Sequence, residues 1–382
     1  QTFTLEAWPL NPFFIRIVTV SIICLVAGGA AGRYLLSPGP QRIIVRETVE
    51  KKPDFKAPES VYLKWTMASA FRGDTPQFGT LGRSFTTKLR RASAGAMQIG
   101  FRRTRPADRG RKCFEAVVVG KVETCWSTPG YWTSTEKALA LFSGVPFGPD
   151  AQEYLAWYYY GGGEELLDEI YGGHGLKSVL CGVTAAEGGG WFREEIVGAG
   201  FFKDKKIRIF GLGARVIEKL GATAVRLNAE EIKKALEAGQ IAGAEYSIPL
   251  IDLNLGLNTA AKFYYVPGWH KPATLLELLV RRGVWNGLAD AAKTTIRNAC
   301  GDTIREGLAE GASHQPAAIR ELTAKGVEIR KFPKDVLNAL ELAWQKVAEE
   351  ESTANPLFKR VWRSLISFRA EYRLWDNKSR LP

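Results

Sequence analysis

KKIRIFGLGARVIEKLG, residues 205–221, is the stretch that decides the fold class. A short run of β-forming residues leads into Gly211 and Gly213, and a helical pattern of apolar residues follows. We therefore predict a strand, a tight turn and a helix. A dinucleotide-binding turn has the same order but needs a third glycine, and this chain has Val216 there. The stretch predicts an α/β unit without a dinucleotide site.

The same alternation extends on both sides of this unit. We predict strands at 61–68, 96–101, 121–126 and 177–183, and helices at 82–91, 163–171 and 213–220. Asn228 followed by Glu231 is a capping-box pattern, which opens a helix at 229–238. From Asp290 onward the pattern is mostly helical. Strands that alternate with helices favour an α/β fold built on open sheets.

Composition excludes several functional classes. The chain has 382 residues and a formal net charge of +12, which suggests anionic ligands or surfaces. Its five cysteines form no C-x-x-C pair, and His174, His270 and His314 are scattered, so no zinc cluster is predicted. There is no nucleophile elbow, P-loop or H-E-x-x-H motif, and no nucleic-acid-binding signature. We predict neither an enzyme nor a nucleic-acid-binding protein.

The N-terminal part contains an apolar segment. Phe13–Leu36 carries only Arg16 and Arg33 as charged residues, both near its ends. A transmembrane helix needs about 20 apolar residues, so we predict a membrane anchor within residues 1–37. The alternative is a cleaved signal peptide. The Pro-rich, charged stretch 38–60 reads as a linker.

Three charged residues lie in strongly apolar surroundings. Arg208 lies inside a run expected to be a buried strand, and Glu245 and Glu187 have similar neighbours. A buried guanidinium needs an anionic partner. That partner could be the carboxylate of a ligand, or a structural Arg–Glu pair could hold two strands together.

Several long stretches of the chain form a distinctive set. They are CWSTPGYW (125–132), ALFSGVPFGP (140–149), EYLAWYYYGGG (153–163), GGWFREEI (189–196), IRIFGLGARVIEKLGA (207–222), ALEAGQIAGAEYSIPLIDLNLG (235–256) and YYVPGWH (264–270). With these stretches the chain resembles the solute-binding subunits of tripartite ATP-independent periplasmic (TRAP) transporters, in the branch associated with 2-oxo acids and other small monocarboxylates. The resemblance runs from about Lys64 to Trp375.

The resemblance implies a two-lobed α/β fold of the periplasmic-binding-protein type (type II-like) that closes over a ligand. Lobe I would span 61–183 with crossing segments at about 266–300, and lobe II would span 184–265. Helices at 301–382 would pack on both lobes or on a partner.

The resemblance also implies the binding residues. Arg208 matches the arginine that clamps the ligand carboxylate, and aromatic residues would wall the cleft. The expected walls are Trp126, Tyr131 and Trp191. A sodium or calcium ion would lie beside the ligand, held by Glu187, Glu245 and the Tyr246 carbonyl, because hard oxygen ligands suit these ions.

Lys271 departs from the family pattern. It follows PGWH, where the family usually has an acid or an amide. An ammonium cannot ligate a cation. Lys271 could pair with Glu187 or Glu245 in place of the metal, the site could have lost the family's ligand, or the side chain could point to solvent.

Two further stretches have alternative interpretations. The basic segment 101–112 is either a solvated loop or a surface for acidic lipids or an acidic partner. In the last helix, apolar residues recur at spacings of three or four from Phe358 to Trp375. That stripe is either core packing or a docking face, for example in a homodimer.

Two functions fit these observations. The first is a membrane-tethered receptor that clamps a small carboxylate and delivers it to an integral membrane subunit of a transporter, with its globular part in the periplasm. The second is a receptor-derived accessory subunit of a larger membrane complex. The periplasmic location conflicts with the positive-inside rule, because five basic residues follow the uncharged stretch Ile17–Gly32 and only Arg16 precedes it. The five are Arg33, Arg42, Arg46, Lys51 and Lys52.

Overall fold

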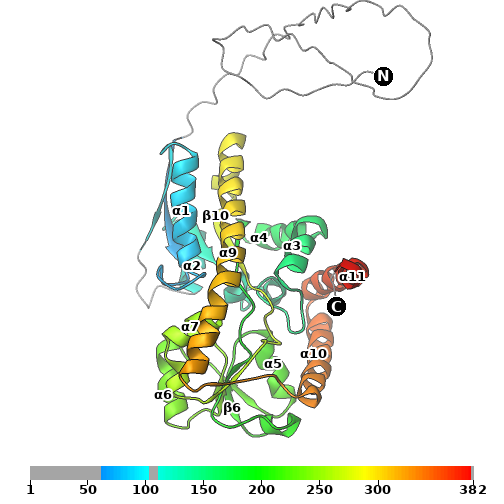
Figure 1. The fold of residues 1–382 in the computed structure, drawn as a ribbon. Helices are drawn as coiled ribbons and strands as arrows, with labels where there is room; N and C mark the ends of the chain where they lie inside the picture. Colours follow the sequence, from blue (N-terminus) through cyan, green and yellow to red (C-terminus); the bar gives the residue numbers. More distant parts are fainter. Residues whose placement is uncertain (1–61, 103–110, 380–382) are drawn as a thin grey trace, which may run out of the picture. The chain divides into compact units, whose positions relative to one another are not determined.

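The computed structural model describes residues 62–102 and 111–379 (Figure 1). The predicted anchor and linker, and residues 103–110 of the basic segment, lie outside these ranges. Within them, no helix combines the length and the apolar character that a membrane span requires.

The first sheet has five strands in the order β2-β1-β3-β10-β4. β1 pairs in parallel with β2 and β3, whereas β10 runs antiparallel to β3 and β4. The strands are β1 Leu63–Ser69, β2 Met97–Phe101, β3 Thr124–Ser127, β4 Leu176–Val183 and β10 Leu275–Arg281. The four strands predicted before position 184 are therefore confirmed.

The second sheet has six strands in the order β11-β9-β5-β8-β6-β7. They are β5 Gly190–Phe192, β6 Lys206–Arg208, β7 Thr223–Val225, β8 Gly243–Ala244, β9 Phe263–Tyr265 and β11 Glu328–Arg330. The strand and helix predicted from residues 205–221 are confirmed as β6 and the following α5, Leu212–Lys219. Gly211 between them has a φ of 68°, a conformation that favours glycine.

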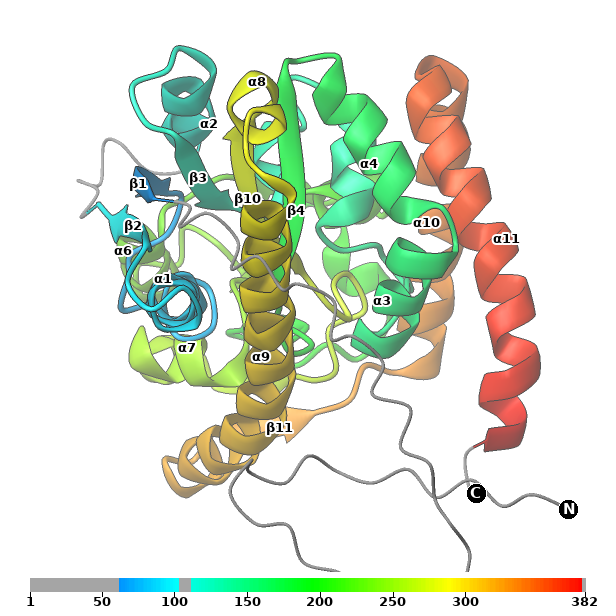
Figure 2. The same cartoon turned by 90° about the horizontal axis from the view of Figure 1, so that it is seen from above.

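Helices cover both sheets (Figures 1 and 2). Those before β10 are α1 Thr80–Ala92, α2 Arg111–Val118, α3 Ala151–Tyr160, α4 Gly163–Gly172, α6 Ala229–Glu237 and α7 Pro249–Asn254. Those after it are α8 Arg282–Asn286, α9 Asp290–Ala324, α10 Lys334–Ala354 and α11 Pro356–Ser379. At the start of α6, the backbone N–H of Asn228 donates to the Glu231 carboxylate (2.7 Å), as the capping-box pattern predicts.

The chain passes between the sheets several times. It leaves the first sheet after β4, returns as β10, and reaches the second sheet again as β11. The helix α9 makes one of these passages and packs on α1 and β4 of the first lobe and on α7 of the second. The boundary expected at position 301 therefore falls inside one continuous helix.

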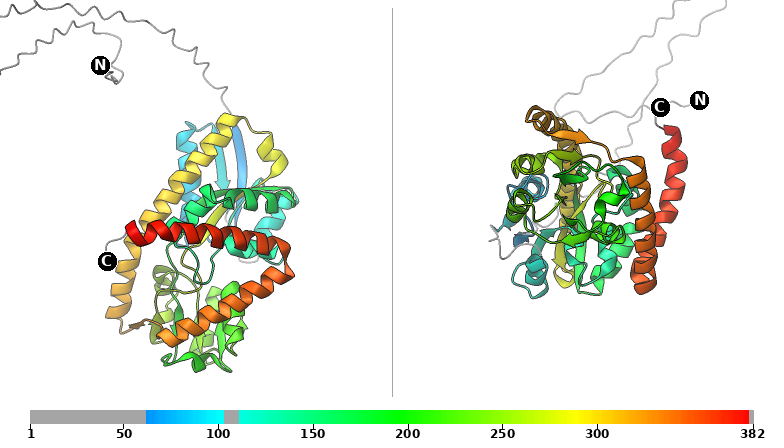
Figure 3. Two further views of the ribbon diagram at one scale, coloured as in Figure 1. Left: turned by 90° about the vertical axis from the view of Figure 1, so that its right-hand side faces the viewer. Right: turned by 90° about the horizontal axis from the view of Figure 1, so that it is seen from below.

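The two C-terminal helices pack on the body of the protein (Figure 3). α10 lies against α5, and α11 lies against α3 and α4. Phe358, Val361 and Leu365 of α11 are fully buried, whereas Leu374 and Trp375 are 69% and 66% exposed. The N-terminal half of the apolar stripe is thus core, and its last turns face outward.

Two disulfides join helices to the first sheet. Cys113 of α2 pairs with Cys125 of β3, and Cys181 of β4 pairs with Cys300 of α9. Disulfides persist in oxidising compartments.

Candidate functional site

Four charged side chains lie near the carboxyl ends of two parallel strands of the second sheet. Arg208 ends β6, and Glu245 follows β8, which runs parallel to β6. Carboxyl ends of parallel strands meet at the same edge of a sheet, where α/β folds bind ligands. Glu187 lies in the connection from β4 to β5, and Lys271 in the connection from β9 to β10.

Backbone hydrogen bonds join these two connections. The N–H of Glu187 donates to the Lys271 carbonyl (3.2 Å), and the N–H of Gly268 donates to the Glu187 carbonyl (2.9 Å). Gly268 is required by this close approach, because a Cβ there would lie 2.6 Å from the Glu187 carbonyl oxygen. The connections between the sheets therefore hold Glu187 and Lys271 side by side.

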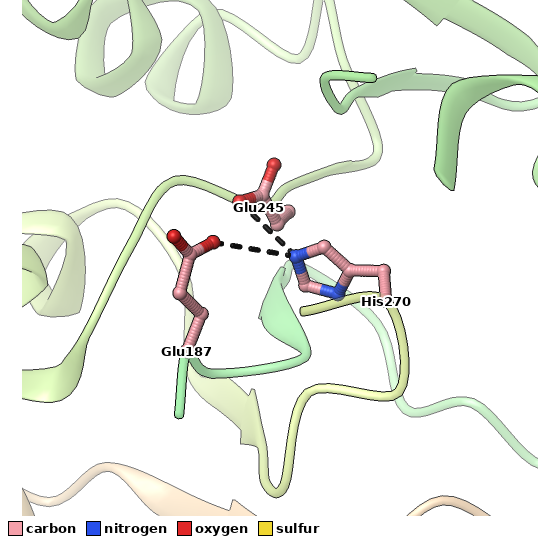
Figure 4. A group of neighbouring side chains, drawn as sticks. All are labelled: Glu187, Glu245 and His270. Atoms are coloured by element: carbon pink, nitrogen blue, oxygen red, sulfur yellow. Dashed lines mark ion pairs between the residues drawn. The ribbon is translucent and has the colours of Figure 1, made fainter. Parts of the chain in front are cut away.

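Two acids and a histidine form the centre of the site (Figure 4). His270 Nε2 lies 3.1 Å from Glu245 Oε1 and 3.6 Å from Glu187 Oε2. All three residues are buried, with exposures of 1–3%. The ligand atoms of these three residues lie within 4.8 Å of one another. Two carboxylates buried this close together need cations beside them, because like charges repel strongly away from water.

Two basic side chains supply positive charge to the acids. Lys271 Nζ donates to Glu187 Oε2 (3.1 Å) and lies 3.5 Å from Glu245 Oε1. Arg208 Nη1 donates to Glu245 Oε2 (3.3 Å) and to the Glu245 carbonyl, and Arg208 Nε donates to the Leu227 carbonyl (3.3 Å). Nη2 of Arg208 donates to no residue in the described part of the chain.

The pKa values follow from burial and from these charges. Burial alone would raise the pKa of Glu245, but Lys271, His270 and Arg208 together hold it well below its usual range. Burial would lower the pKa of Lys271, but Glu187 and Glu245 outweigh it and raise the pKa above its ordinary value of 10.5. Glu245 is therefore a carboxylate and Lys271 an ammonium at neutral pH.

The structure brings together Arg208, Glu187, Glu245 and Lys271, as the resemblance implied. The Tyr246 ring lies under the guanidinium of Arg208, whose Cζ is 5.1 Å from the ring centroid. The half-buried Tyr131 ring contacts Phe210 from the other lobe, with ring centroids 6.0 Å apart.

Trp126 and Trp191 are placed differently from the expectation that they wall the cleft. Both are fully buried. The Trp126 indole donates to the Phe78 carbonyl (2.6 Å), and the Trp191 indole donates to Asp252 (3.0 Å) and stacks on Tyr264. Each lies in the core of its own lobe, because the middle of a sheet offers a large ring more apolar contact than its edge does.

Sequence reasoning missed His270. The spacing of the three histidines in the sequence indicates no cluster, although His270 belongs to the matched stretch YYVPGWH. The sequence feature that could have revealed His270 is its place in this stretch, directly before Lys271, which departs from the family pattern.

A cleft of about 540 Å³ lies beside the charged cluster. Its walls include Tyr131, Ile209, Phe210, Arg215, Arg226 and Phe358. It shares Phe210 and Gly130 with a niche of about 10 Å³ that reaches His270 and Lys271. Lys271 Nζ lies 5.5 Å from the Phe210 ring centroid, so Phe210 borders both the charged cluster and the larger cleft.

Two α/β lobes with several crossings and a charged cluster between them define a solute-binding receptor. The model of the bacterial extracellular solute-binding proteins, family 7 (DctP) matches residues 67–353. The chain belongs to this family, which comprises the solute-binding proteins of TRAP transporters. Members are receptors rather than enzymes, as predicted.

Relatives with known ligands are similar over most of their length. A monocarboxylate 2-oxoacid-binding periplasmic protein of Nostoc sp. is 33% identical over 272 residues, which is 71% of this chain and 75% of the relative. The crystal structure of a TRAP periplasmic solute-binding protein from Colwellia psychrerythraea with bound calcium and pyruvate has a TM-score of 0.79 and 29% identity, and covers 83% of this chain and 97% of that one. One from Pseudoalteromonas atlantica with bound sodium and pyruvate has a TM-score of 0.76 and 28% identity, and covers 82% and 96%.

Proposed function

We propose that this protein is a membrane-tethered TRAP receptor that clamps a small 2-oxo acid between its lobes through Arg208. The supporting observation is the state of Arg208. Arg208 pairs with Glu245, as expected for a structural Arg–Glu pair. Its Nη2 atom, however, has no hydrogen-bond partner among the described residues. Lys271 shares the same acids, so the guanidinium retains a free donor for a ligand carboxylate.

Ligand entry requires movement at the niche. A volume of about 10 Å³ beside Lys271 is about one water molecule in size, too small for a carboxylic acid. Phe210 follows β6 in the second lobe, and Tyr131 belongs to the short 3₁₀ helix Pro129–Trp132 of the first lobe. Separation of the lobes would part these rings and admit the acid, and closure would bury it.

The larger cleft provides room for the rest of the ligand. Its walls near the niche are apolar, with Ile209, Phe210 and Leu212 contributing. An aliphatic chain on the 2-oxo acid would extend into it. We therefore expect acids with longer side chains than pyruvate to bind at least as tightly as pyruvate.

The tether rests on the sequence, the periplasmic side on the disulfides, and the membrane partner on the family. The segment Phe13–Leu36 would anchor the chain, and the linker 38–60 would carry the receptor to a TRAP membrane subunit. Two disulfides favour an oxidising compartment and hence the periplasmic side, against the positive-inside count. Arg208 and Lys271, which keep donors for an anion, favour a receptor over the accessory-subunit alternative.

Calorimetric titration of the full chain with pyruvate and a series of longer 2-oxo acids tests this function. We expect saturable binding, and a loss of about 30-fold or more in affinity in Arg208→Ala, because truncating one member of a buried charged contact costs about 2–5 kcal/mol. Arg83→Ala, at an exposed arginine of α1, is the matched control and should bind as the wild type does. If the folded wild-type chain binds none of these acids, or if Arg208→Ala binds normally, the proposal is wrong.

A further inference from the structure

The residues around Glu187 and Glu245 offer a test of whether a metal ion fits this site. Glu187, Glu245 and His270 present ligand atoms within 4.8 Å of one another, as a cation site would. Related receptors bind calcium or sodium together with pyruvate. In this chain, however, Lys271 Nζ lies 3.1 Å from Glu187 Oε2 and 3.5 Å from Glu245 Oε1. An ammonium has three donors and no lone pair, so it cannot be a ligand and would repel a metal ion. The donor set does not fit a metal.

The fold holds the ammonium in this position. The Lys271 carbonyl accepts from the Glu187 N–H (3.2 Å), which fixes the backbone. The side chain passes over Gly144, where a Cβ would lie only 2.5 Å from Lys271 Cγ. Beyond it, the ammonium faces the Phe210 ring at 5.5 Å from the centroid. The side chain is 14% exposed, so it is not a surface lysine pointing into solvent.

Charge balance supports the same conclusion. The two buried acids, Glu187 and Glu245, already have the cations Arg208 and Lys271 beside them. Against the effect of burial, these acids also raise the pKa of His270, which lies between them. Arg208 Nη2 and the third donor of Lys271 remain for an anion. A metal ion would add positive charge where the acids already have partners.

We propose that the Lys271 ammonium is a built-in cation that replaces the metal ion of related receptors, so that this protein binds its carboxylate without a metal. This inference rests on the proposed function for the identity of the ligand, but not for the exclusion of the metal. Lys271 would contact the ligand carboxylate opposite Arg208. Its positive charge would make ligand binding independent of a metal ion.

Calcium titration of the full chain, after chelation and without any acid, tests the exclusion of the metal. We expect no saturable calcium binding and no calcium-dependent change in Tm for the wild type. Lys271→Glu and Lys271→Gln should both bind calcium saturably, at least about 10-fold more tightly than the detection limit of the wild-type titration, because each replaces the ammonium by an oxygen donor. Lys331→Glu makes the same charge change at an exposed lysine after β11 and should bind no more calcium than the wild type.

A second titration uses pyruvate and longer 2-oxo acids with and without a chelator. The wild-type affinity should agree within about 2-fold between the two conditions. Calcium binding by the wild type, a requirement for calcium or sodium, or the absence of calcium binding in both Lys271 variants would overturn the inference. Failure of every acid to bind would instead refute the proposed function, and the calcium titration would still decide the role of Lys271.

Discussion

Two buried glutamates in this protein have opposite surroundings. Glu277 lies in the middle of β10, and Glu245 directly follows the carboxyl end of β8. Each is 1% exposed. Glu277 accepts hydrogen bonds from neutral groups only, the Tyr171 hydroxyl (2.8 Å), the Ser178 hydroxyl (2.8 Å) and the Trp132 indole (3.2 Å). Glu245 instead contacts Arg208, His270 and Lys271.

The neighbours, and not the burial, decide the charge of each acid. Burial raises the pKa of Glu277 to about 7, although its three donors partly oppose this. At Glu245 the nearby positive charges outweigh burial and hold the pKa well below its usual range. Neutral donors that fully satisfy an acid indicate a structural role. Cations that retain free donors indicate a site for a further anion.

The largest expected difference between the two acids is in stability. Glu245→Gln leaves Arg208 and Lys271 short of a counter-ion, so we expect a loss of about 3–5 kcal/mol in the free energy of unfolding. Glu277→Gln resembles the neutral acid and keeps its hydrogen bonds, so at pH 6 we expect a change below about 1 kcal/mol. Urea unfolding followed by tryptophan fluorescence measures both. If the two variants lose the same free energy of unfolding, the distinction between a charged Glu245 and a neutral Glu277 is wrong.

The pH dependence should differ in sign. The pKa of Glu277 is raised from 4.5 to about 7, so the folded state binds a proton that the unfolded state releases, and stability falls as pH rises through this window. The total effect is up to about 3 kcal/mol. Glu245 has a lowered pKa, so its contribution is present above its ordinary pKa of 4.5 and is lost as pH falls below it.

The difference in stability between the wild type and Glu277→Gln, measured between pH 4.5 and 8, isolates the first effect. We expect the decline with pH to be shallower in the variant. A decline of equal slope in both proteins would show that Glu277 is ionised throughout this range.

The smallest effect is expected at one hydrogen bond. Tyr171→Phe removes a donor to Glu277, so we expect a loss of about 1 kcal/mol and a further rise in the pKa of Glu277. Affinity for 2-oxo acids should not change, because Tyr171 contacts the structural acid and not the cluster. Thermal unfolding and calorimetric titration of the same sample check both statements. A change in ligand affinity would show that the two acids are coupled.

The fold was largely predictable from local patterns. The strand, glycine turn and helix at 205–221 form as expected, since their apolar spacing and Gly211 leave few alternatives. The boundary expected at 301 lies inside α9, and nothing in the local pattern shows that this helix continues between the lobes. The burial of Trp126 and Trp191 was not predictable either, because an aromatic residue near a cleft and one in a core have the same sequence signature.

By itself, the sequence determined the α/β alternation, the family and the identity of Arg208, Glu187, Glu245 and Lys271 as charged residues to be explained. It did not separate Glu245 from Glu277, since each is an acid in an apolar run. Only the tertiary structure decided that difference. It brings Lys271 to Glu187 across 84 positions and Arg208 to Glu245 across 37, and a buried acid takes its charge from neighbours a few ångströms away in space.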